Sequence, residues 1–115
     1  METQICSNIK KCYENGWIAP LDGNMSGRIA NTKRFFITPA SLRKHELIDK
    51  DIVKVDIDYA NNQINVNKDQ RKPSGELHLH CHFMLDEDYI DEDLCIVHCH
   101  PKHILAFAGL LNSDR

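Results

Sequence analysis

The sequence lacks long apolar runs and concentrated basic segments. No apolar stretch approaches the roughly 18 residues of a membrane-spanning helix. The N-terminal stretch METQICSNIKK has no apolar signal core, so nothing in it directs export. Lys and Arg number 14 against 17 Asp and Glu, and the net charge is −3. We therefore expect neither nucleic acid nor a membrane as the main partner.

The cysteines do not form a disulfide framework either. Their number is odd, and they are spread through expected helices and strands at Cys6, Cys12, Cys81, Cys95 and Cys99. This pattern favours reduced thiols and a cytoplasmic protein. The chain has 115 residues, of which 42% are hydrophobic, and shows no repeat. We expect a single domain over residues 1–115, at the small end for a self-sufficient core.

Hydrophobic periodicity and turn residues predict a mixed α/β chain. The expected helices cover residues 2–17, 75–85 and 101–111, with Ser74 capping the second and Pro101 opening the third. The expected strands cover residues 25–30, 34–38, 52–58, 64–67 and 94–100. Residues 42–50 are expected to form a short helix or a loop, and residues 68–75 and 86–93 are expected to connect elements.

The stretch CIVHCHPKH, residues 95–103, contains the densest group of possible metal ligands. On a strand, His98 and His100 project from the same face and could bind one divalent metal. Cys95 and Cys99 are expected on the opposite, core-facing side, and no second cysteine pair has zinc-finger spacing. A strand that simply carries two polar histidines remains the alternative.

The second histidine-rich stretch is RKPSGELHLHCH, residues 71–82. His78 and His82 are four residues apart on one helical face, a spacing that can bind metal. No Glu follows His78 directly, so we favour a solvated or subunit-facing surface; His80 lies elsewhere on the helix. Glu76 is expected in the first helical turn, where the helix dipole favours an ionised carboxylate.

Five motifs in order resemble the class II aldolase/adducin family: GNMSGRI, FFITPASLRKHEL, DIVKVDID, RKPSGELHLH and IVHCHPKHILAFA. The resemblance covers the chain from the first helix to about Gly109. It implies a three-layer α/β/α sandwich around a mostly antiparallel central sheet. It also implies a homotetramer with active sites at subunit interfaces.

The resemblance assigns roles to individual residues. His98 and His100 match zinc ligands, with one Zn²⁺ per subunit. Glu76 matches the catalytic glutamate and is expected in the metal site as well, within reach of the ion. Residues that match the substrate phosphate site are Asn24, Ser26, Thr38, Ser41, Ser74 and Gly75. Small polar residues of this kind also form turns, and each could serve only that purpose.

The implied activity is zinc-dependent retro-aldol cleavage of a phosphorylated sugar, a ketose 1-phosphate such as fuculose 1-phosphate. Zinc would act as a Lewis acid and Glu76 as general acid and base. The same family chemistry would serve a methylthioribulose-1-phosphate dehydratase or a pentulose-phosphate 4-epimerase. A non-catalytic adducin-like domain, or a metal-binding domain without turnover, is the other alternative.

The chain departs from the family pattern at two places. Ser41 stands where the family turn usually has Gly, which would allow backbone conformations that Ser resists. No residue matches the third zinc histidine, which lies downstream in the family, and His103 is a doubtful substitute because it follows Pro101 on the next helix. We therefore expect a domain truncated at its C-terminus, with little or no activity on sugar phosphates by itself, whose missing strands leave sheet edges open.

Overall fold

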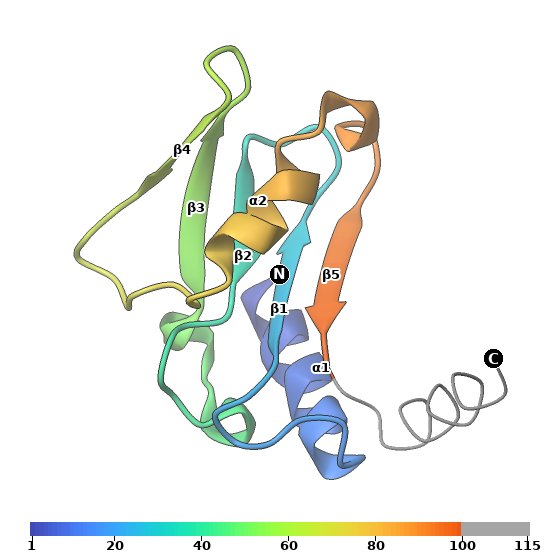
Figure 1. Cartoon of the computed structure of the whole chain (residues 1–115), viewed down its shortest axis with the longest axis vertical. Coiled ribbons are helices and arrows are strands. Elements are labelled where there is room, and N and C mark those ends of the chain that lie inside the picture. The colour runs from blue at the N-terminus through green and yellow to red at the C-terminus, as the bar shows by residue number, and fades with distance from the viewer. Residues whose placement is uncertain (100–115) are drawn as a thin grey trace, which may run out of the picture.

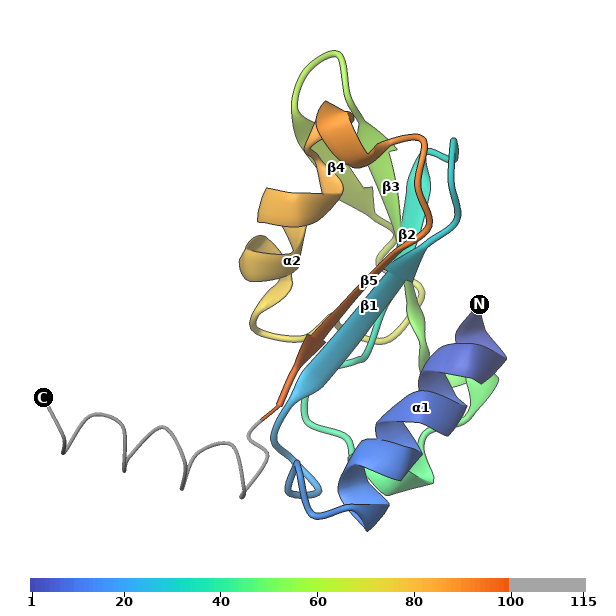
Figure 2. The same cartoon turned by 90° about the vertical axis from the view of Figure 1, so that its right-hand side faces the viewer.

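The computed structural model describes residues 1–99. They form a five-stranded sheet with α1 on one face and α2 on the other (Figures 1 and 2). The helices are α1, Glu2–Glu14, and α2, Leu77–Met84. The strands are β1 (Asn24–Arg28), β2 (Arg34–Ile37), β3 (Val53–Asp58), β4 (Gln63–Val66) and β5 (Leu94–His98), in the spatial order β4-β3-β2-β1-β5. Every neighbouring pair is antiparallel, which confirms the expected three-layer class.

The two faces of the sheet bury separate apolar clusters. Along β3, Val53, Val55 and Ile57 are buried and alternate with exposed polar residues, as the period of two predicts. These side chains pack with Met84 of α2. On the other face, α1 packs with Met25 of β1. Each helix therefore covers one face of the same sheet.

The first helix ends three residues earlier than expected. Its C-cap is Asn15, and Gly16 adopts the left-handed conformation with φ 73°. The Trp17 N–H bonds to the Cys12 carbonyl at 2.9 Å, and the Gly16 N–H bonds to the Tyr13 carbonyl at 3.0 Å. This is a Schellman ending, which glycine permits at low cost. The prediction was wrong because it followed the apolar stripe past the glycine.

Other boundaries also differ from the sequence predictions. The second helix begins at Leu77 rather than at residue 75, and Glu76 is its N-cap residue instead of part of the first turn. Residues 42–50 contain the 3-10 helix Lys44–Glu46 and the start of Asp49–Asp51, and the later connection contains Glu87–Tyr89. The last expected strand ends at His98 within the described range. His100, His103 and the helix expected at residues 101–111 lie outside the described residues.

Arg28 stabilises the connection between α2 and β5 through hydrogen bonds to backbone carbonyl groups. Its guanidinium is fully buried, donates to the Met84 carbonyl at 2.9 Å and contacts the Tyr89 carbonyl. It also donates to the Tyr59 hydroxyl at 3.2 Å. A buried cation is tolerated where several oxygens replace water, and here one of them belongs to the C-terminal end of a helix. No helix within residues 1–99 is long and apolar enough to cross a membrane.

Candidate functional site

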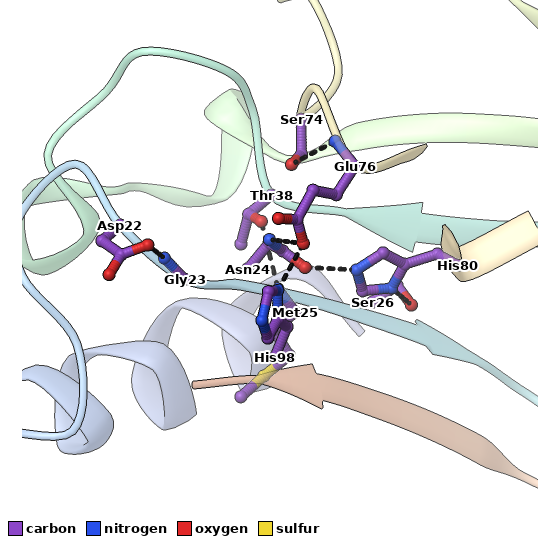
Figure 3. Close-up of polar contacts among 10 residues, drawn as sticks. All are labelled: Asp22, Gly23, Asn24, Met25, Ser26, Thr38, Ser74, Glu76, His80 and His98. Atoms are coloured by element: carbon purple, nitrogen blue, oxygen red, sulfur yellow. Dashed lines mark hydrogen bonds and ion pairs between the residues drawn. The ribbon is translucent and has the colours of Figure 1, made fainter. Parts of the chain in front are cut away.

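Three distant segments bring polar side chains together on the face of the sheet that carries α2 (Figure 3). Asn24 begins β1, His98 ends β5, and the two are direct partners in the antiparallel register. Glu76 reaches both of them. Its Oε2 atom accepts from Nδ2 of Asn24 at 2.9 Å and contacts Nδ1 of His98. The expected catalytic glutamate therefore lies beside one of the two expected metal ligands.

The loop before α2 is fixed against the end of β2. Pro39 and Pro73 form an isolated antiparallel bridge, and the Ser74 N–H donates to the Thr38 carbonyl at 3.0 Å. The Ser74 hydroxyl accepts from the Glu76 N–H at 3.2 Å. Ser74 therefore forms a local turn just before the helix; the prediction that it caps the helix was wrong, because the N-cap residue is Glu76 and has no side-chain cap bond. These bonds leave the Glu76 side chain directed toward β1 and β5.

Glu76 is held in its ionised form. The hydrogen bond from Asn24, followed by the contact with His98, lowers the pKa of its carboxyl group. Its side chain is 41% exposed, and that of His98 is 34% exposed. A carboxylate that is charged, hydrogen-bonded and open to solvent can accept a proton from a ligand or bind a cation.

His80 is a site residue that the sequence analysis missed. It is fully buried, its Nδ1 lies 2.5 Å from the Ser26 hydroxyl, and its Nε2 contacts Oδ1 of Asn24. Burial lowers its pKa from 6.5 to about 4, so the ring is neutral. The available signal was the spacing to Glu76, because residues four apart lie on one side of a helix. His78 and His82 are exposed on α2, in agreement with the favoured interpretation that they lie on a solvated or subunit-facing surface.

A pocket of about 290 Å³ opens beside Glu76. Four of the six residues expected to bind phosphate line it: Asn24, Ser41, Ser74 and Gly75. Hydroxyl, amide and backbone donors around a small cavity are suited to an anionic group.

The remaining two residues of the expected phosphate set are buried. The Thr38 hydroxyl accepts from the Met25 N–H at 3.2 Å, and the Ser26 hydroxyl faces His80. Neither residue lines the pocket. Their hydroxyl groups are used within the protein, and the pocket wall is built without their side chains.

Two turns at this pocket have left-handed backbone. Gly23 has φ 77°, and a Cβ atom placed on it would lie 2.5 Å from Cγ2 of Ile18, so only glycine suits both the conformation and the space. Ser41 has φ 61°. The conformation that the family glycine would allow is therefore adopted by serine here, with the strain that a side chain adds.

Lys44 supplies a cationic side chain in the pocket wall that the sequence analysis did not single out. It is buried, and its Nζ atom donates to the Leu42 carbonyl at 3.1 Å. Burial lowers its pKa, and the nearby charge of Asp22 opposes that shift. The pocket therefore combines one lysine with the carboxylates of Asp22 and Glu76.

Glu76 and His98 provide two donors of the kind that divalent metals bind in proteins. An ionised carboxylate and an imidazole in contact, both partly open to solvent, fit part of a metal site. Residues 1–99 contain no group of three such side chains close enough to hold a metal ion. His100, the second expected histidine ligand, is outside that range.

The chain is similar to a known protein family and to solved structures. A model of the Class II Aldolase and Adducin N-terminal domain matches residues 3–115. The chain belongs to this family. The comparison with curated proteins gives no match.

Two solved structures share the family fold. L-fuculose 1-phosphate aldolase has a TM-score of 0.72 and 26% identity, covering 95% of this chain and 48% of the other. YgbL from Escherichia coli, a candidate aldolase/epimerase/decarboxylase, has a TM-score of 0.68 and 17% identity, covering 88% and 44%. The class II aldolase fold is therefore shared, and this chain spans about half the length of either structure.

Proposed function

We propose that this chain carries part of the active site of a zinc-dependent class II aldolase-like lyase that cleaves a phosphorylated sugar. The substrate class is a ketose 1-phosphate, and fuculose 1-phosphate is its first candidate. Membership of the family and the likeness to an L-fuculose 1-phosphate aldolase support the reaction class. The single observation that carries the proposal is the meeting of Asn24, His98 and Glu76 beside the pocket.

The pocket is suited to the phosphate group of such a substrate. Asn24, Ser41, Ser74 and Gly75 line it with amide, hydroxyl and backbone groups. Donors of this kind bind phosphate without needing much formal positive charge. Lys44 adds one cationic group to the same wall.

Glu76 would act first as the general base and then as the general acid of the reaction. It would accept the proton of the substrate hydroxyl that lies β to the carbonyl. The bond between the α and β carbons then breaks, the β carbon leaves as an aldehyde, and the electron pair passes to the α carbon and the carbonyl as an enediolate. Returning the proton to carbon completes the ketone product and restores the Glu76 carboxylate. Its lowered pKa favours the form that accepts a proton.

A zinc ion, when bound, supplies Lewis-acid stabilisation of the negative charge that develops next to the carbonyl. His98, His100 and Glu76 would hold it. The contact between Glu76 and His98 supports this choice for two of the three residues. We also propose a homotetrameric assembly, by analogy with the family.

The test is a cleavage assay on ketose 1-phosphates with the zinc-loaded full-length protein, as wild type and as the Glu76→Gln variant. The amide keeps the size of the carboxylate and cannot act as a base, so we expect the rate to fall about 10²–10⁴-fold while His98 and His100 keep zinc bound. His78→Gln is the matched control, because His78 is exposed on α2. Unchanged cleavage in Glu76→Gln, or no cleavage of any ketose 1-phosphate by the wild type, would reject the proposal.

A further inference from the structure

We propose that His80 is a positioning residue of this site, which sets the orientation of the Asn24 amide so that its NH₂ group faces Glu76. The inference deepens the proposed function, on which only its catalytic consequence rests. The orientation itself follows from hydrogen bonds within residues 24–80.

The Glu76 carboxylate determines which atom of the Asn24 amide faces it. A carboxylate at neutral pH has only acceptor atoms, so the group that faces Oε2 of Glu76 at 2.9 Å must be a donor. The Asn24 amide can supply that donor only through Nδ2. Its Oδ1 is then directed to the other side, where it meets Nε2 of His80. Since Oδ1 can only accept, Nε2 must carry the proton.

The hydrogen bond at Nδ1 of His80 is consistent with a proton on Nε2. A neutral imidazole has one N–H group, so Nδ1 of His80 is an acceptor. The Ser26 hydroxyl lies 2.5 Å from it and can donate. The bonds therefore run in one direction, from the Ser26 hydroxyl through the His80 ring and the Asn24 amide to Glu76.

The strand spacing makes this arrangement possible. Asn24 and Ser26 are two residues apart on β1 and project from the same face of the sheet. One imidazole from α2 contacts both of them, through its two different nitrogens. Both ring nitrogens of this buried histidine are therefore satisfied by side chains of β1.

Reversing the Asn24 amide would cost free energy, because hydrogen bonds on both of its sides would be lost. Its residue surface is only 4% exposed, so its amide cannot turn to water for a partner. If the amide were reversed, Oδ1 would face the Glu76 carboxylate and NH₂ would face a ring N–H, which places like groups together on both sides. The Nε2–H group of His80 therefore selects the orientation in which the site presents a donor to Glu76.

The test reads this orientation directly. In the ¹⁵N-labelled chain at pH 7, long-range ¹H–¹⁵N spectra should show His80 as the Nε2–H tautomer with an unprotonated Nδ1. In His80→Leu, which fills the space without a donor, the Asn24 side-chain amide protons should exchange with solvent about tenfold faster. His80→Gln can donate from its own amide and should recover part of that protection. His78→Leu, an exposed change on the same helix, should have no effect.

The outcomes separate the two proposals. An Nδ1–H tautomer in the wild type overturns the role of His80, even where the variants do not fold. Unchanged Asn24 exchange in a folded His80→Leu protein overturns it too. A wild type with the Nε2–H tautomer and no cleavage of ketose 1-phosphates would reject the proposed function alone. With activity present, His80→Leu should lower kcat more than it changes KM, and His80→Gln should restore part of kcat.

Discussion

Asn24 and His98 lie opposite each other in the pairing of β1 with β5, and their side chains contact the same oxygen atom of Glu76. The sheet register therefore sets the distance between the two groups that hold the carboxylate. A change at any one of these three residues alters the surroundings of the others. The predictions on Asn24 and on zinc rest on this relationship.

The first prediction concerns the donor to Glu76. Asn24→Asp replaces the Nδ2 donor by an oxygen and places two carboxylates together at a buried position. We expect the free energy of unfolding at pH 7 to fall by about 2 kcal/mol, with part of the loss recovered as the pH is lowered toward 4. Urea denaturation at several pH values measures both effects.

The matched control for this change is Asn8→Asp on the exposed surface of α1. It adds the same charge without disturbing a buried hydrogen bond, so its effect should stay within about 0.5 kcal/mol. Equal losses in the two variants would show that charge alone, and not the lost donor, explains the result.

The second prediction concerns metal binding. His98→Ala should weaken zinc binding by about tenfold or more, because an imidazole in contact with Glu76 is lost from the donor set. Isothermal titration with Zn²⁺ measures the change. His82→Ala removes an exposed imidazole from α2 and should leave this affinity unaltered. Equal zinc affinity in His98→Ala and the wild type would remove His98 from the site.

The third prediction concerns Arg28. Arg28→Met fills similar space but leaves the Met84 and Tyr89 carbonyls without their donor. We expect the unfolding free energy to fall by about 2–4 kcal/mol. The control is Arg34→Met, since Arg34 is half exposed and pairs with Asp56 at 2.7 Å on the same sheet. That pair should be worth at most about 1 kcal/mol, so similar losses would contradict the role given to Arg28.

The elements of the fold were largely predictable from local patterns. The alternation of Val53, Val55 and Ile57 indicates a half-buried strand, and the stripe of Ile5 and Ile9 indicates a helix. Both depend only on neighbours in sequence. The order of the strands depends on contacts between distant segments, and periodicity contains no information about it. For the same reason, the prediction that Cys95 lies on the core side of its strand was wrong, and the structure exposes this residue.

The candidate site, too, could be predicted only in part from the sequence. The resemblance brought Glu76 and His98 together as site residues, but their contact across 22 residues arises from the sheet order and from the loop bonded to β2. His80 was missed for a different reason. The i, i+4 spacing was applied to His78 and His82, whereas the same spacing from Glu76 points to His80. The burial that makes His80 a partner of Ser26 and Asn24 comes from packing α2 on the sheet.

The last prediction is a pH dependence of stability that arises from His80. Its pKa is near 6.5 in the unfolded chain and is lowered to about 4 in the fold, chiefly by burial. Between these values the unfolded state binds more protons than the folded state. The unfolding free energy should therefore be highest above pH 6.5 and fall as the pH decreases toward 4, by about 3 kcal/mol in total. Urea denaturation at pH 7, 6, 5 and 4.5 measures the slope.

His80→Gln provides the comparison, because glutamine can donate to Asn24 and does not titrate. Its absolute stability will differ from the wild type, since an amide packs differently from a ring, so the slopes are the quantities to compare. Carboxylates and the other histidines contribute equally to both proteins and cancel in the difference. We expect the wild-type slope to exceed the variant slope by about 1 kcal/mol per pH unit between pH 6 and 5. Parallel slopes would mean that His80 takes up a proton in the fold as readily as in the unfolded chain, and the lowering of its pKa by burial would be wrong.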